Sequence, residues 1–262
     1  MLKIASWNVN SLKIRLEQVL SWLKSSEVDI LALQETKLID EQFPTFEFHN
    51  QGYHVAYTGQ KTYNGVAVIS RKPIEQVTIE VPGFMDPQRR MLAVTIAGMR
   101  LINLYVPNGS EVGSSKYQYK LNWLEVMTGF IQQELKHYPH LAVVGDFNIA
   151  PEDKDVHDPS VWDGCVMVSP QERKAFADLA LLGLHDSFRC LHPEEQAYTW
   201  WDYRAACFRR NRGLRIDHIL LSDKLRQHCL ESWIDVEPRR AERPSDHAPV
   251  CAKLSELQLH LL

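Results

Sequence analysis

One stretch of the sequence places an acid and an amide two residues apart, directly after an apolar run. The run covers residues 141–145 and is followed by Asp146, Phe147 and Asn148. Side chains alternate along an extended strand, so Asp146 and Asn148 should point the same way from the strand's end. A solvated turn after a core strand would give the same pattern, and this stretch alone does not separate it from a functional site.

Polar groups also follow other predicted strands. The strand expected over residues 2–7 leads into Asn8, and the buried strand expected over 28–33 leads into Glu35. Between them, residues 14–25 show the spacing of an amphipathic helix. Strand, helix and strand within about 35 residues form a crossover unit, so Asn8 and Glu35 should lie at one edge of a parallel pair.

The side chains at predicted strand ends are mostly amides and carboxylates. They are Asn8, Asn10, Glu35, Tyr105, Asn108, Asp146, Asn148, Asp217, Asp246 and His247. Hard oxygen ligands of this kind suit magnesium or manganese rather than zinc. Carboxylates crowded together would repel one another, and a bound cation relieves that repulsion. The pattern therefore predicts a metal site of the type used in phosphoryl chemistry.

Asp217 and His247 form a second candidate pair. The carboxylate would fix the imidazole tautomer, so that the ring acts on a nucleophile or on a transition-state oxygen. Taken alone, the tripeptide Ser245-Asp246-His247 is more often an ordinary surface turn. The sequence has no Gly-x-Ser-x-Gly elbow and no Walker-type glycine-rich loop. Attack of water on a phosphodiester is the chemistry that uses all of these side chains.

Composition and charge limit the class of protein. The chain has 262 residues, a net charge of −4 and five cysteines without a C-x-x-C pair. The number and spacing of the cysteines suggest neither a disulfide framework nor a thiolate zinc site, and a reducing compartment fits them best. No signal peptide and no apolar run of roughly 20 residues is present, so we expect a cytoplasmic protein without membrane attachment. Residues 203–216 hold five arginines and no acid, which predicts a local basic patch.

The remaining elements alternate between strands and helices. Runs at 65–70, 77–81 and 91–96 are β-rich and separated by turn residues, which favours hairpins. Capping boxes predict helix starts at Ser115 and at Ser169. No linker-like segment divides the chain.

Six segments, in this order, resemble the exonuclease III family of apurinic/apyrimidinic endonucleases, part of the endonuclease/exonuclease/phosphatase superfamily. They run from Ser6 to Asn10, Leu33 to Lys37, Leu104 to Gly109, Gly145 to Asn148, Gly213 to His218 and Ser245 to Pro249. Each motif is modest, but jointly they are specific and cover nearly the whole chain. The resemblance implies a single domain over residues 1–262, an α/β four-layer sandwich with two mixed β-sheets packed face to face and helices outside.

The resemblance also implies roles for individual residues around a metal ion. Glu35 would be the principal ligand of Mg²⁺, with Mn²⁺ as a substitute, and Asp146 would orient or deprotonate the attacking water. The implied metal-binding group is Asn10, Glu35, Asp146, Asn148, Asp246 and His247. The implied catalytic group is Tyr105, Asp146, Asn148, Asp217 and His247. Which of these is the general base stays open.

DNA contacts are implied by further matches. Trp200, Leu214 and Ile216 match the family's apolar pocket for a flipped-out baseless sugar, whereas Trp201 is better explained by core packing. The remaining residues implied to hold DNA are Asn8, Asn108, Arg90, Lys116 and Arg212. A merely solvated run of charge is the alternative explanation for the arginines.

Together these features predict a magnesium-dependent repair nuclease, acting as a monomer on duplex DNA. It would incise 5′ to abasic sites and act at 3′ ends as an exonuclease or end-cleaning phosphodiesterase. The alternatives are a relative acting on lipids or inositol phosphates, and a catalytically silent DNA-binding module. Ser11 stands where the family usually has glycine, which would stiffen the turn after Asn10. The sequence does not rank the endonuclease and exonuclease activities.

Overall fold

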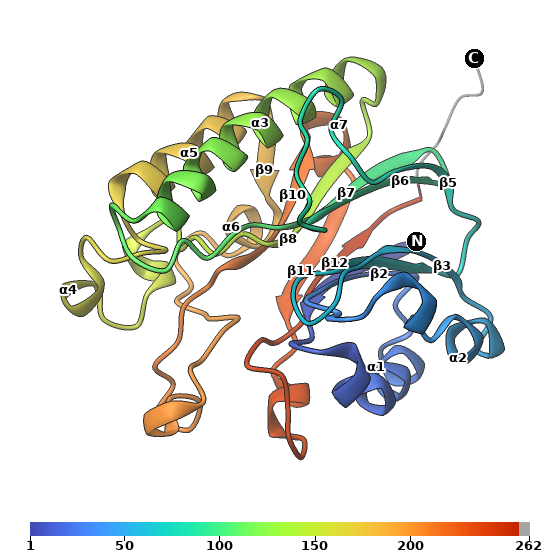
Figure 1. Cartoon of the computed structure of the whole chain (residues 1–262), viewed down its shortest axis with the longest axis horizontal. Helices are drawn as coiled ribbons and strands as arrows, with labels where there is room; N and C mark the ends of the chain where they lie inside the picture. Colours follow the sequence, from blue (N-terminus) through green and yellow to red (C-terminus); the bar gives the residue numbers. More distant parts are fainter. Residues whose placement is uncertain (257–262) are drawn as a thin grey trace.

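Two six-stranded β-sheets pack face to face, and helices cover their outer faces (Figure 1). In this computed structural model the description covers residues 1–256. Helices α3 and α5 lie on one side of the paired sheets and α1 and α2 on the other. The predicted four-layer α/β sandwich is therefore confirmed.

The first sheet has the strand order β11-β12-β1-β2-β4-β3. Its strands are β1 (Leu2–Asn8), β2 (Ile30–Gln34), β3 (His54–Thr58), β4 (Val66–Ser70), β11 (Cys229–Ile234) and β12 (Val250–Leu254). The last strand, β12, lies between β11 and β1, so the chain's N-terminal and C-terminal strands pair directly.

The second sheet has the order β5-β6-β7-β8-β10-β9. Its strands are β5 (Glu75–Thr78), β6 (Met91–Ile96), β7 (Met99–Tyr105), β8 (Leu141–Asp146), β9 (Leu184–Asp186) and β10 (Asp217–Ser222). All of them come from one continuous part of the chain, between β4 and β11.

The α-helices vary widely in length. They are α1 (Leu12–Ser26), α2 (Thr45–Asn50), α3 (Ser115–His137), α4 (Pro159–Trp162), α5 (Pro170–Leu181), α6 (Ser187–Leu191) and α7 (Asp223–Arg226). Short 3-10 turns are η1 (Asp40–Gln42), η2 (Asp153–Asp155), η3 (Arg204–Ala206) and η4 (Glu237–Arg240). Within the described residues, no helix has the length and apolar character needed to span a membrane.

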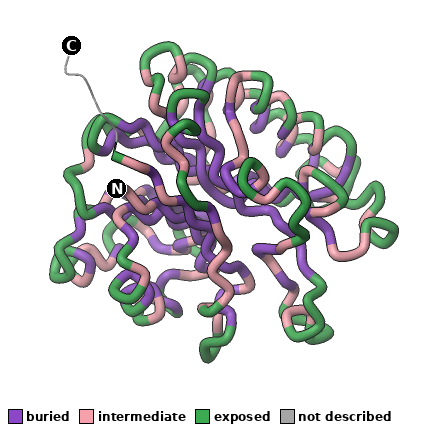
Figure 2. Tube along the Cα trace, turned by 180° about the vertical axis from the view of Figure 1, so that it is seen from behind, coloured by how far each residue is buried: buried purple, intermediate pink, exposed green. Residues whose placement is uncertain are grey.

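Side-chain alternation divides the core into three layers. One face of each sheet packs against the other sheet, for example through Ile4, Ala32, Leu101 and Val144. The outer faces pack under α1 and α2 on one side and under α3 and α5 on the other. Figure 2 shows the buried strands running through the middle of the molecule, with exposed segments on the surrounding helices and loops. Burial on both faces explains why these strands are continuous apolar runs in the sequence.

The parallel pairs bring polar strand ends to one edge. In β1 and β2, Asn8 lies opposite Gln34, the residue before Glu35. In β7 and β8, Tyr105 lies opposite Asp146. The predicted crossover geometry is therefore confirmed for the first pair, and it recurs in the second.

Two local predictions were wrong in detail. The N-cap of α3 is Ser114 rather than Ser115, because Ser114 has extended backbone and its side chain accepts a hydrogen bond from the backbone N of Tyr117. The strand predicted over 77–81 is β5, which ends at Thr78. Its pairing with β6 is irregular, and Gln76 has a left-handed φ of 48°. The capping box at Ser169 is confirmed.

We expect Ser114→Ala to lower the free energy of unfolding by about 1 kcal/mol, because it removes the side-chain cap of α3. Ser115→Ala is the matched control, since Ser115 is exposed and already inside the helix. Urea denaturation of both variants checks this. A larger loss of unfolding free energy in Ser115→Ala than in Ser114→Ala would contradict the assignment of Ser114 as the cap.

Candidate functional site

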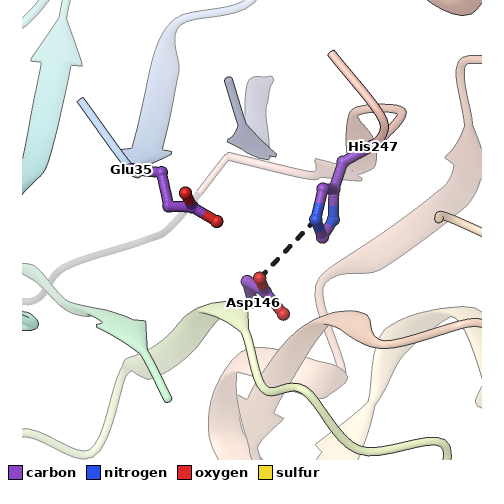
Figure 3. A group of neighbouring side chains, drawn as sticks. All are labelled: Glu35, Asp146 and His247. Atoms are coloured by element: carbon purple, nitrogen blue, oxygen red, sulfur yellow. Dashed lines mark ion pairs between the residues drawn. The ribbon is translucent and has the colours of Figure 1, made fainter. Parts of the chain in front are cut away.

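Three ionisable side chains converge where the layer between the sheets opens to solvent. One potential ligand atom from each of Glu35, Asp146 and His247 lies within 4.8 Å of the others. Glu35 directly follows β2, Asp146 ends β8 and His247 precedes β12. Figure 3 shows the three side chains pointing toward one another. The structure thus brings together residues that lie between 101 and 212 positions apart in the sequence.

Asn8 connects the two carboxylates of this cluster. Its Nδ2 donates to Glu35 Oε1 at 2.9 Å and to Asp146 Oδ2 at 2.8 Å. Asn8 is fully buried at the end of β1. Its amide therefore fixes the carboxylate of the first sheet against that of the second.

Asp217 holds the imidazole of His247. The ring Nδ1 lies 2.8 Å from Asp217 Oδ2 and donates to it, which directs Nε2 toward Asp146 Oδ2 at 3.7 Å. Burial alone would lower the pKa of His247, but the nearby charges of Asp217 and Asp146 outweigh it and raise the pKa to about 10. His247 is thus a cation with both ring nitrogens able to donate.

Burial raises the pKa of Asp146 to about 7, and the negative charge of Asp217 adds to this effect. The positive charge of His247 and the hydrogen bond from Asn8 act in the opposite direction. The backbone N of Asn148 also donates to Asp146 Oδ1 at 2.9 Å. Asp146 therefore changes its protonation near neutral pH, as a general base requires.

Asp246 and Asn10 lie beside this cluster. Asn10 Nδ2 donates to Asp246 Oδ1 at 3.0 Å, and Trp200 Nε1 donates to Asp246 Oδ2 at 3.0 Å. Although burial would raise the pKa of Asp246, the charge of His247 and these two hydrogen bonds hold it below its usual value. Asp246 is therefore kept ionised.

Sequence inspection did not single out Lys37. Its Nζ donates to Asn10 Oδ1 at 2.7 Å and forms an ion pair with Glu35 Oε2 at 3.0 Å. The signal available in the sequence was a basic residue two positions after the predicted metal ligand. Lys37 partly neutralises the cluster from its open side.

The turn after Asn10 is conformationally unusual. Asn10, Glu35 and Asn148 all have left-handed φ, between 43° and 52°. Ser11 has φ 89°, in a region that favours glycine, so the expected stiffening of this turn takes the form of a strained backbone. Backbone hydrogen bonds from Ser11 to Glu35 O and from Leu12 to Thr36 O hold it in place. Such strain is typical of functional sites.

Tyr105 and Asn108 reach the site from the end of β7. Burial raises the pKa of Tyr105 well above its usual value, with further contributions from Glu35 and Asp146, so the phenol stays protonated. Arg90 stacks on its ring, with the guanidinium carbon 4.6 Å from the ring centre. Asn108 Nδ2 donates to Asn148 Oδ1 at 3.1 Å.

Lys120 holds the backbone at both Asn108 and Asn148. It is fully buried, and its Nζ donates to Asn148 O at 2.7 Å, to Asn108 O at 3.1 Å and to Glu172 Oε1 at 2.5 Å. Lys116, by contrast, is exposed on the first turn of α3, and Arg212 is exposed on the basic loop. No hydrogen bond joins either side chain to the cluster among the described residues.

The predicted apolar pocket residues also come together. Trp200, Leu214 and Ile216 pack in one cluster with residues of the loop after Asn148, including Trp162 and Met167. Leu214 and Ile216 are fully covered, whereas Trp200 is only partly buried. Trp201 lies in a separate buried cluster, which agrees with its predicted packing role.

The donor set fits a hard divalent cation. Glu35 and Asp146 supply carboxylate oxygens, and the amides of Asn8 and Asn10 lie beside them. Carboxylates this close favour a bound cation, because the cation reduces their mutual repulsion. Oxygen-rich sites of this type suit Mg²⁺ or Mn²⁺.

Comparison with known proteins agrees with this architecture. A model of the Endonuclease/Exonuclease/phosphatase family matches residues 5–247. The chain is 34% identical to an exodeoxyribonuclease III of Haemophilus influenzae, covering 96% of this chain and 99% of that protein. A Neisseria 3′ phosphatase, solved with a product DNA hairpin, is 46% identical with a TM-score of 0.96, covering 98% and 100%. An AP endonuclease from Archaeoglobus fulgidus is 40% identical with a TM-score of 0.95, covering 98% and 100%.

We expect His247→Gln to raise the pKa of Asp146 further above 7 in metal-free protein, by about one to three units, because the substitution removes a nearby positive charge. Carbon-13 NMR of the aspartate carboxyl groups, titrated from pH 5 to 9 in the presence of chelator, measures this shift. An unchanged or lowered midpoint would contradict the assigned electrostatics.

Proposed function

The chain belongs to the Endonuclease/Exonuclease/phosphatase family, and we propose that it is a metal-dependent DNA repair nuclease that hydrolyses phosphodiester bonds of duplex DNA. The observation that carries the proposal is the convergence of Glu35, Asp146 and His247 at one edge of the paired sheets. The names of the relatives support it, because they include an exodeoxyribonuclease, a DNA 3′ phosphatase and an AP endonuclease. We propose that the chain acts as one domain and as a monomer.

A divalent cation belongs to this proposal. Glu35 would hold Mg²⁺, or Mn²⁺ in its place, with Asn10, Asp146, Asn148, Asp246 and His247 around it. When bound, the cation would supply positive charge beside the negative charge that develops on the phosphate.

Residues of the chain accept the proton, orient the base and stabilise the phosphate. Asp146 accepts a proton from the attacking water, since the pKa of its carboxyl group is about 7. Asn8 and Asn148 orient that carboxylate, through hydrogen bonds to Oδ2 and Oδ1 respectively. His247, held by Asp217, donates from Nε2 to a phosphate oxygen and stabilises its growing charge.

Tyr105 acts on the leaving group. Its phenol stays protonated because burial and the neighbouring carboxylates raise its pKa, so it donates a hydrogen bond. Asn108, which donates a hydrogen bond to Asn148 Oδ1, would contact the same phosphate.

DNA would lie across this edge of the molecule. Arg90, Lys116 and Arg212 would contact backbone phosphates on either side of the scissile bond. Trp200 is only partly buried, unlike Leu214 and Ile216 in the same apolar cluster, so a flipped baseless sugar would meet it before those two residues. The proposed activities are incision 5′ to abasic sites and removal of nucleotides or blocking groups from 3′ ends.

An end-labelled duplex with one abasic analogue tests the proposal. With Mg²⁺ we expect a cut immediately 5′ to the lesion, shortening from the 3′ end, or both, and no cleavage with chelator. Asp146→Asn should lower turnover by about 10²- to 10³-fold while DNA binding is retained, because it removes the base. Glu152→Gln, an exposed acid outside the cluster, is the matched control. Undiminished cleavage by Asp146→Asn would overturn the site assignment, and cleavage in chelator would overturn metal dependence.

Trp200→Ala should reduce cleavage at an abasic analogue more than shortening of an undamaged 3′ end, because only the first substrate places a sugar in the apolar pocket. We expect the ratio of the two rates to fall by about tenfold, which corresponds to about 1.4 kcal/mol. Initial rates on the two duplexes, measured in parallel for both proteins, give this ratio. An equal loss on both substrates would assign Trp200 to the site in general, through its hydrogen bond to Asp246.

A further inference from the structure

A buried polar link joins the two sheets directly beneath the site. Gln34 of β2 donates from Nε2 to Asn103 Oδ1 of β7 at 2.7 Å and to Ser6 Oγ of β1 at 3.0 Å. Asn103 in turn donates from Nδ2 to the backbone oxygens of Leu33 at 3.0 Å and Ala67 at 2.9 Å. None of the three polar side chains is exposed. One side chain of the second sheet thus hydrogen-bonds to two strands of the first.

The position of this link in the strands is informative. Gln34 directly precedes Glu35, and Asn103 precedes Tyr105 by two residues on the same face of β7. Tyr105 is in turn opposite Asp146. The link therefore lies one step below the place where Glu35 of the first sheet faces Asp146 and Tyr105 of the second.

Stability alone does not account for these polar groups. The layer beyond them is apolar, with Ala32 and Leu101 at the equivalent positions one pleat deeper. Burying amides costs free energy unless each group is hydrogen-bonded, and Gln34 Oε1 has no partner among the described residues. A pair of apolar side chains would fill the same space without that cost.

Directional hydrogen bonds fix the relative position of the two sheets more strictly than apolar packing does. Apolar contacts are non-directional, so they define the relative position of two sheets less strictly than hydrogen bonds do. A shift of about 1 Å between reacting groups can cost about 100-fold in rate. The link fixes the relative position of the sheets at the level where their carboxylates meet.

We propose that Gln34 and Asn103 are positioning residues that set Glu35 against Asp146 and Tyr105. This inference rests on the proposed nuclease function. The two side chains contact no substrate and act through the strands that carry the site.

The test uses Gln34→Met and Asn103→Leu, which keep side-chain size but remove the hydrogen bonds, and the double variant. We expect kcat on the DNA duplex to fall about 10- to 100-fold in each single variant, with KM changed less than threefold. The double variant should lose no more than the worse single variant, because both substitutions break one unit. Circular dichroism verifies that each protein is folded at the assay temperature.

Val94→Ala is the matched control. Val94 lies in the same inter-sheet layer but outside the link, so its truncation should lower the urea midpoint and leave kcat unchanged. Ser6→Ala is a milder variant that removes only one acceptor of Gln34, and it should lower kcat about threefold even where the larger changes prevent folding.

The outcomes separate the two proposals. A wild-type protein that cuts DNA, with both single variants within twofold of its kcat, overturns the positioning role alone. An equal fall of kcat in Val94→Ala also overturns it, because loosening of the core would then suffice. Absence of cleavage by the wild-type protein overturns the proposed function and this inference with it.

Discussion

The rest of the structure depends on one constraint. Several carboxylates of the site are confined in a space that is nearly closed to water. Asp146 is buried beside Glu35 on one side and near Asp217 on the other. The repulsion among these carboxylates is offset by the His247 cation, the Lys37 ammonium and the Asn8 amide. Burial, with a further contribution from the charge of Asp217, raises the pKa of Asp146 to about 7, so the His247 cation and the hydrogen bonds compensate only in part. The site in the folded chain therefore still favours additional positive charge, which costs some stability. It does so at the place where the chemistry requires that charge.

The packing of the layered fold offsets the repulsion between these confined charges. Strands β1, β2, β7 and β8 are apolar along most of their inner faces and turn polar only within their last three residues. The apolar part supplies the stability that keeps the sheets together. This packing keeps the polar strand ends of the two sheets close together, although moving apart would relieve the repulsion between them.

Much of this arrangement followed from local sequence pattern. The alternation along each strand placed Asn8 and Asp146 on definite faces, and the crossover from β1 to β2 placed Glu35 at the same edge. The pairing of Asp217 with His247 was predicted from their chemistry and is present at 2.8 Å. The roles of these residues came from resemblance to a family, and they stay predictions.

The missing parts have physical explanations. Periodicity tells which face of a strand is buried but not which sheet covers it, so the bond between Gln34 and Asn103 was not foreseen. Lys37 and Lys120 resemble ordinary surface lysines until tertiary partners are known. The cap of α3 was displaced by one residue, because Ser114 and Ser115 offer the same hydroxyl and only backbone conformation distinguishes them.

The order of strands in the first sheet has a consequence for synthesis on the ribosome. The second sheet is built from one continuous segment and can assemble while translation continues. The first sheet cannot, because β12 fills the position between β1 and β11, and His247 emerges just before it. A nascent chain can therefore carry Asp146 in an ordered sheet before it has a complete site. The capacity to cut DNA appears only after His247 and β12 have been synthesised.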